Sequence, residues 1–342
     1  MRDCDVKLSL RYDMRAPEIG VDSPDQYAAA LDHAAWADEV GFETVYLAEH
    51  HGADDGYCAA PMILGSAILG RTRRLTVHLS ALVAVLHHPL RLAEDLATLD
   101  LIGGGRVEVT AGIGYRDFEY RMFGVERRHR ARILEETVQI LRQAWTGAEF
   151  DFRGERVRVR PRPARPQGPP LFIGGSADAS AVRAARIGDG YRPAGSDKDR
   201  LYEIYAAERR RLGEPVPPQA PTLGPLFLFV SDNPARDWEI VAPHVLYTTN
   251  SNAAWARERG VGTTAYQAAA GLADLQQDPN IRVVTPDECL ALCEKLGPDA
   301  ELVFQPLMGG LPLEAGWRSL RLFESDVLPE LVARGYRTPA DR

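Results

Sequence analysis

The sequence predicts an α/β fold in which parallel strands alternate with helices, and we expect a single (β/α)8 TIM barrel over residues 1–342. Apolar stretches of strand length alternate with segments of helical periodicity along the chain. Residues 75–85 are nearly continuously apolar, as in a strand buried on both faces of a parallel sheet. An open doubly wound sheet is the alternative. It would need a glycine-rich dinucleotide motif after the first strand, where the chain reads Arg11-Tyr12-Asp13-Met14.

Eight segments have the composition of strands, although the sixth, after Gly188-Asp189-Gly190-Tyr191, is a weak signal. The other seven are 6–10, 44–48, 75–85, 107–111, 171–173, 223–230 and 301–305. Helices are expected between them at 23–41, 61–69, 88–102, 130–145, 179–187, 199–212 and 287–296, with a short one after Arg116 and a last one through 317–331. Ser23-Pro24 is typical of a helix start, and Gly41 and Gly103-Gly104-Gly105 are typical of helix ends.

Two stretches interrupt this alternation. Residues 147–167, after the fourth helix, contain two short alternating runs about Gly154 followed by several prolines, which predicts a small hairpin and a stiff connection rather than a domain boundary. Residues 253–280, after the seventh strand, are rich in glycine and alanine, and we expect a long mobile loop there.

The composition is that of an ordinary soluble protein, with 45% hydrophobic and 26% charged residues among 342. The net charge of −8 argues against a nucleic-acid binder, which would present a basic face. Four scattered cysteines suggest neither a disulfide framework nor a zinc site, so no metal is expected. The polar N-terminus and the absence of a long apolar run predict a reduced, cytoplasmic protein without a membrane span.

Polar and small residues follow three of the predicted strands. Glu49-His50-His51 follows the second strand, Gly112-Ile113-Gly114 the fourth and Gly174-Gly175-Ser176 the fifth. In a barrel, ligands bind where parallel strands end, so these segments should surround one mouth. Glycines there let a bulky ligand approach the backbone, and Gly174-Gly175-Ser176 before a helix, with Ser180 in its first turn, is suited to a phosphate.

The order of short motifs resembles the bacterial luciferase family of flavin-dependent monooxygenases. The chain carries, in sequence, Glu49-His50-His51, His88-Pro89, Ala93-Glu94-Asp95 and Gly105-Arg106, then 285–289 and 322–329 near its end. The resemblance covers roughly the whole chain and supports the count of eight strands. It implies oxidation of a small apolar organic substrate, an aldehyde or ketone, by O2 and reduced FMN from a separate flavin reductase. It also implies a homodimer, or a dimer with a close relative, packed through helices near the first four strands.

The resemblance also assigns roles to residues at the mouth. His50 matches the catalytic histidine of the family, with Glu49 or His51 as the residue that orients it. A cis peptide bond is expected between Ser80 and Ala81, beside the flavin ring. The phosphate is expected at the segment that contains Ser176. The residues expected to bind the flavin are Ser80, Ala81, Gly112, Ile113, Arg116, Arg130, Gly174, Gly175, Ser176 and Ser180.

Two other functions remain open at this point. Some barrels of this superfamily use a deazaflavin coenzyme for hydride transfer, and the motifs do not separate this from FMN chemistry. A non-catalytic flavin-binding partner subunit is the other alternative, against which His50 argues. Among the remaining histidines, His33 and His129 are expected to be solvated, and His87 and His88 to be structural.

Overall fold

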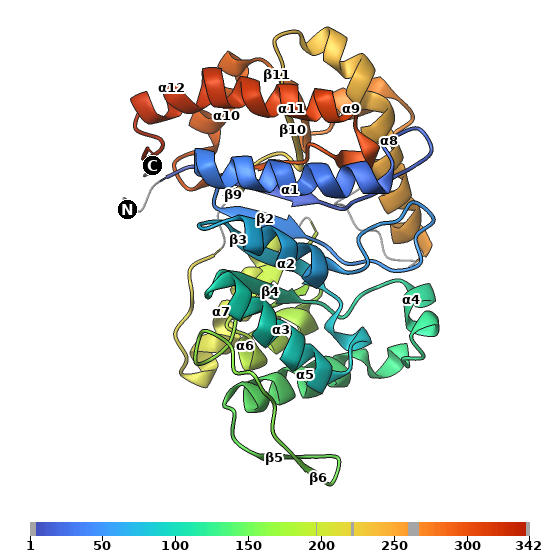
Figure 1. The fold of residues 1–342 in the computed structure, drawn as a ribbon, viewed down its shortest axis with the longest axis vertical. Coiled ribbons are helices and arrows are strands. Elements are labelled where there is room, and N and C mark those ends of the chain that lie inside the picture. Colours follow the sequence, from blue (N-terminus) through green and yellow to red (C-terminus); the bar gives the residue numbers. More distant parts are fainter. Residues whose placement is uncertain (1–4, 196, 220–221, 259–266, 340–342) are drawn as a thin grey trace.

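The computed structural model describes residues 5–195, 197–219, 222–258 and 267–339. Figure 1 shows strands gathered in the middle of the molecule with helices packed outside them. The strands are β1 (Lys7–Tyr12), β2 (Thr44–Leu47), β3 (Thr76–Leu82), β4 (Val107–Ala111), β5 (Phe150–Phe152), β6 (Glu155–Val157), β7 (Leu171–Gly175), β8 (Gly190–Pro193), β9 (Thr222–Leu223), β10 (Phe227–Val230), β11 (Ile281–Val284) and β12 (Ala300–Phe304).

The α-helices occupy most of the connections between strands. They are α1 (Ser23–Val40), α2 (Pro61–Arg71), α3 (Pro89–Gly103), α4 (Asp117–Met122), α5 (Arg130–Trp145), α6 (Asp178–Ile187), α7 (Lys198–Leu212), α8 (Pro234–Glu258), α9 (Leu272–Gln277), α10 (Pro286–Leu296), α11 (Leu313–Leu322) and α12 (Leu328–Ala333). None of the helices in the described ranges is long and apolar enough to cross a membrane.

The main sheet is parallel and has the strand order of an eight-stranded barrel. Its order is β11-β10-β12-β1-β2-β3-β4-β7-β8, and β9 pairs with β12. The eight strands from β10 round to β8 therefore follow the cyclic order 7-8-1-2-3-4-5-6, which confirms the predicted α/β barrel class. Within the described residues no ladder joins β8 to β10, and β11, which sequence analysis did not predict, pairs with β10 instead.

The helix ends follow ordinary capping rules. Asp22 rather than Ser23 caps α1, its side chain accepting a hydrogen bond from the Asp25 N–H, with Pro24 in the first turn. Gly41 ends α1 at a φ of 95°, a left-handed conformation that glycine adopts without strain. At α10, Thr285 and Glu288 form a reciprocal capping box.

The core lies between the sheet and the surrounding helices. Strand residues such as Leu8, Val45, Val77 and Val109 are fully buried in it. A second apolar cluster packs α8 onto β10 through Trp238, Val241 and Val245 against Phe227 and Phe229. This packing fixes α8 against β10, and the last turn of α8 becomes part of the site described below.

The two irregular stretches differ in outcome. The predicted hairpin is present as β5 and β6, an antiparallel pair that projects from the body of the molecule (Figure 1). The predicted long loop is wrong for its first part, because α8 continues as a helix to Glu258, and α9 lies within the same stretch. Residues 259–266 lie outside the described residues.

Candidate active site at the carboxyl ends of β2 and β4

His50 stands directly after β2, and a carboxylate from a different element orients it. Its Nδ1 atom lies 2.8 Å from Oε1 of Glu119, which is carried by α4 beyond the end of β4. The same oxygen accepts the backbone N–H of His51 at 3.0 Å and lies 3.4 Å from a guanidinium nitrogen of Arg116. The His50 side chain is 13% exposed and the Glu119 side chain fully buried. Glu119 thus holds the His50 ring through Nδ1, and part of the ring stays accessible to solvent.

The charge on Glu119 determines which nitrogen of His50 is available. Burial raises the pKa of Glu119, but hydrogen bonds from His50 and from the His51 amide, together with the Arg116 charge, lower it overall. An ionised carboxylate can only accept, so Nδ1 of His50 must carry the hydrogen. Nε2 is then the acceptor, 3.5 Å from the hydroxyl of Tyr115, and it is the atom that can take or give a proton at the mouth.

Glu49 joins the ends of β2 and β3. Its Oε1 accepts from His51 Nε2 at 2.9 Å and from His87 Nε2 at 2.8 Å, while Oε2 accepts the N–H of Val83. Burial raises the pKa of Glu49, yet these hydrogen bonds outweigh it and lower the pKa to about 2. The carboxylate therefore stays charged and fixes two loops beside His50, and among the described residues its hydrogen bonds go to His51, His87 and Val83 rather than to the His50 side chain.

The backbone between β3 and β4 presents small residues toward the same mouth. The Ser80–Ala81 peptide bond is cis, as the family resemblance implied, and the register of β3 against β4 shifts between Ser80 and Leu82. The Gly112 N–H donates to the carbonyl of Leu82 at 2.8 Å, and a Cβ on Gly112 would lie 3.3 Å from that of Ala81. A side chain at residue 112 would therefore crowd Ala81, whereas glycine leaves this surface open.

The start of α6 offers one exposed hydroxyl and one that is already bonded. Ser176 is exposed, whereas Ser180 is buried, with its Oγ accepting from the Ala177 N–H at 3.1 Å and lying 3.0 Å from the hydroxyl of Tyr191. Asp178 in the first turn pairs with Arg200 at 2.7 Å. No hydrogen bond or ion pair in the described part of the chain joins Arg116 or Arg130 to this segment; Arg130 donates instead to the Arg127 carbonyl at 3.0 Å.

Comparison with known protein families gives a match over most of the chain. The sequence profile of the luciferase-like monooxygenases matches residues 12–302. The chain belongs to this family.

Two relatives of the chain are named for different reactions, one a dehydrogenase and one a monooxygenase. The chain is 30% identical over 182 residues to the F420-dependent glucose-6-phosphate dehydrogenase of Nakamurella multipartita, covering 50% of this chain and 53% of that protein. It is 27% identical over 157 residues to the alkanal monooxygenase alpha chain of Photorhabdus luminescens, covering 44% of this chain and 43% of that protein. The matched part of the chain spans about half the length of the curated relatives.

A solved structure supports the fold over nearly the whole chain. The oxygenating constituent of 3,6-diketocamphane monooxygenase from Pseudomonas putida, in complex with FMN, superposes with a TM-score of 0.71 at 18% identity, covering 96% of this chain and 99% of that one. At this identity the similarity establishes the fold alone.

Sequence analysis missed several residues of this luciferase-like site. Glu119, rather than Glu49 or His51, contacts His50, and no motif marks it because α4 lies 69 residues further along the chain. Trp255 on α8 lies against His50 with a ring-centroid distance of 5.0 Å, and Arg15, after β1, places its guanidinium 4.2 Å from the same indole. Their contributions depend on tertiary packing, which leaves no local signal.

The other histidines also separate by environment. His33 was expected to be solvated, and this is wrong: it faces inward from α1, fully buried between Tyr12 and Trp317, and burial lowers its pKa to about 3. His129 pairs with Glu126 at 3.3 Å on the surface. His87 belongs to the Glu49 network, and His88 packs against Phe152.

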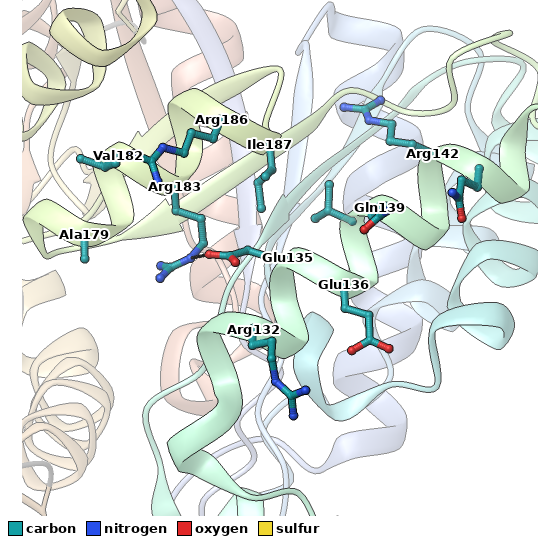
Figure 2. Close-up of a pocket in the computed structure, with 12 residues that line it drawn as sticks. Arg132, Glu135, Glu136, Gln139, Arg142, Ala179, Val182, Arg183, Arg186 and Ile187 are labelled. Carbon is teal, nitrogen blue, oxygen red and sulfur yellow. Dashed lines mark hydrogen bonds and ion pairs between the residues drawn. The ribbon is translucent and has the colours of Figure 1, made fainter. Parts of the chain in front are cut away.

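A groove of about 930 Å³ lies elsewhere, between α5 and α6 (Figure 2). Its walls carry arginine and glutamate side chains that neutralise each other, as between Arg183 and Glu135 at 2.9 Å, and Arg142 pairs with Asp189 at 2.6 Å. It lies between outer helices and contains none of the strand-end residues above. We therefore place the candidate site at the strand ends and not in this groove.

Proposed function

We propose that this chain is a flavin-dependent monooxygenase that uses reduced FMN and O2 to oxidise a small organic substrate of the aldehyde or ketone class. The observation that carries the proposal is His50, oriented by a buried carboxylate at the carboxyl ends of the strands and beside the cis Ser80–Ala81 peptide. The family match and the alkanal monooxygenase relative support it.

The residues present fit FMN at this edge of the sheet. Gly112, Ile113 and the Ser80–Ala81 peptide leave a small-residue surface against which a flat ring can lie. Gly174, Gly175 and Ser176 lead into the N-terminus of α6, a position that favours a phosphate, and Arg200 pairs with Asp178 in the first turn. Ser180, Arg116 and Arg130 are less direct candidates, because the Ser180 hydroxyl and one terminal guanidinium nitrogen of each arginine already bond within the chain.

Bound reduced FMN supplies the electrons that activate O2. The chain supplies proton control: Nε2 of His50 can accept a proton from the reacting substrate and return it, while Glu119 holds the ring and stabilises its protonated form. Glu49 keeps the loop that carries His51 and the entry to α3 in place. A separate flavin reductase would deliver the reduced FMN, and we propose a homodimer or a dimer with a close relative.

The proposal is tested by O2 consumption with chemically reduced FMN across aldehydes and ketones. The wild-type protein should consume O2 in a substrate-dependent manner. His50→Ala should lose roughly 10²–10⁴-fold in turnover, the usual contribution of a general acid or base, and should keep its FMN affinity. His129→Ala, which alters a surface histidine, is the matched control. Full activity in His50→Ala would refute the assigned role.

A second candidate function is hydride transfer with the deazaflavin coenzyme F420. The F420-dependent dehydrogenase relative, 30% identical over the matched half, favours it. Titration of the purified protein with FMN and with F420, followed by absorbance, separates the two. Tight binding of F420 and no O2 consumption would replace the first proposal with the second. A non-catalytic subunit role would require His50 and Glu119 to be dispensable in both assays.

A further inference from the structure

Trp255 occupies the space directly in front of His50. Its indole ring lies 5.0 Å from the His50 ring and 5.8 Å from that of Tyr57, measured between centroids. The guanidinium groups of Arg15 and Arg116 lie 4.2 and 3.9 Å from its centroid. We call His50, Tyr57, Arg15 and Arg116 the ring cage. Trp255 itself is only partly buried and sits one turn before the end of α8.

The ring cage is held together without Trp255. Arg15 is 1% exposed and is fixed by Asp55 and by the Asn252 side chain at 2.9 Å. Arg116 is 8% exposed and donates to the His51 carbonyl at 2.8 Å. Departure of the indole would therefore leave both guanidinium groups where they are.

The two arginines also retain binding capacity. The Nε atoms of Arg15 and Arg116 are buried and have no hydrogen-bond partner among the described residues. A buried donor without a partner is costly, and an acceptor oxygen on a ligand would remove that cost. The indole offers only a π face and one N–H donor, so it cannot satisfy either group.

The shape and electrostatics of the cage select for flat conjugated rings. Guanidinium groups stack on π faces, and the edges of histidine and tyrosine rings pack favourably against them. A saturated chain presents no π face and gains none of these contacts. The indole gains these contacts as a planar ring, and it packs against the His50 ring.

We propose that the ring cage is the substrate subsite for a planar, conjugated ring that carries an acceptor oxygen, and that Trp255 occupies it until such a ring displaces the indole. This rests on the proposed function and narrows it, because it replaces a general apolar aldehyde or ketone with an aromatic or conjugated one. Trp255 is then the residue that determines which substrates reach His50.

The test compares binding of 1-naphthaldehyde and decanal to wild type, Trp255→Ala and Trp255→Phe, by equilibrium dialysis without flavin. Trp255→Ala should bind 1-naphthaldehyde at least tenfold more tightly than wild type, because nothing competes for the cage, and should bind decanal within threefold of wild type. Trp255→Phe keeps a ring in place and should show little gain. Weaker or unchanged naphthaldehyde binding in Trp255→Ala, or an equal gain for both ligands, would overturn the proposal.

Tryptophan fluorescence gives a second readout that does not depend on whether Trp255→Ala folds. Naphthaldehyde should change the wild-type emission as the indole leaves the two guanidinium groups, and Trp255→Phe should lack that change. Identical responses in the two proteins would refute displacement. Because these measurements need no turnover, absence of O2 consumption alongside the expected binding pattern would reject the monooxygenase proposal and keep the subsite. If the protein turns over decanal and Trp255→Ala changes neither binding nor turnover, the monooxygenase proposal stands and the subsite is rejected.

Discussion

The buried histidine on α1 should make the protein acid-sensitive in a range that is easy to measure. His33 is fully buried, and neither ring nitrogen has a hydrogen-bond partner among the described residues. Burial lowers its pKa from the ordinary 6.5 to about 3. The unfolded chain therefore binds a proton below pH 6.5 that the folded chain does not bind until about pH 3. Stability must fall as the pH falls through this window.

The size of the effect follows from the two pKa values. One unit corresponds to about 1.4 kcal/mol, so His33 should cost about 2 kcal/mol at pH 5 and about 3 kcal/mol at pH 4, relative to pH 7. His33→Phe keeps an aromatic ring between Tyr12 and Trp317 but cannot take up a proton. The free energy of unfolding of His33→Phe, relative to that of wild type, should increase by these amounts as the pH is lowered.

Urea unfolding at pH 7, 5 and 4 measures this difference directly. Comparing the change in stability with pH removes any constant effect of the new ring on packing. His129→Gln is the control. That histidine lies at the surface, so its replacement should leave the loss of stability between pH 7 and pH 4 nearly unchanged. Parallel pH dependence in wild type and His33→Phe would mean that His33 is hydrated or paired in solution, and would refute the acid sensitivity assigned to its burial.

Three further outcomes are expected. Glu119→Gln keeps the shape of the residue but removes its charge, so turnover should fall roughly 10–100-fold with FMN binding retained, and the double variant with His50→Ala should be no worse than His50→Ala alone. Additive losses in that double variant would rule out a shared role. Ser176→Ala should weaken FMN binding by on the order of 1–3 kcal/mol and leave riboflavin binding unchanged, whereas Ser180→Ala should mainly lower stability, since its hydroxyl bonds within α6; equal weakening of riboflavin would reject the phosphate assignment. Sedimentation should show a dimer at micromolar concentration that Ile63→Asp dissociates, because this apolar side chain on α2 is 74% exposed, and a monomeric wild type would contradict it.

Regular elements were predictable because their signals are local. The Ser-Pro and Thr-Pro helix starts, Gly41 and the alternating strands all act through backbone preferences over a few residues. The Ser80–Ala81 cis peptide was expected only because the chain resembles a known family. The strand pattern itself placed His50 after the end of β2, as the structure shows.

What escaped prediction depends on contacts between distant segments. Pro243, Asn250 and Asn252 are residue types that disfavour a helix, yet all three lie within α8. Tertiary hydrogen bonds hold the two asparagines there: Asn250 bonds to the backbone of Ala269, and Asn252 accepts from Arg15. The position of His33 in the helical repeat of α1 is compatible with an exposed or a buried side chain. Its burial is determined by Trp317, which packs against it from a distant segment. Glu119 gains its role from the fold that brings α4 to β2.

The shared oxygen of Glu49 has a consequence for how this site tolerates change. His51 and His87 donate to the same Oε1 atom, from two loops that are unrelated in sequence. If one histidine is lost, the other still anchors the carboxylate, so either single replacement should be mild and the double replacement disproportionately severe. Because of this redundancy, one of the two loops can change in sequence while the histidine of the other loop keeps the Glu49 carboxylate in place. Variation in this region should therefore accumulate at residue 51 or at residue 87, and seldom at both.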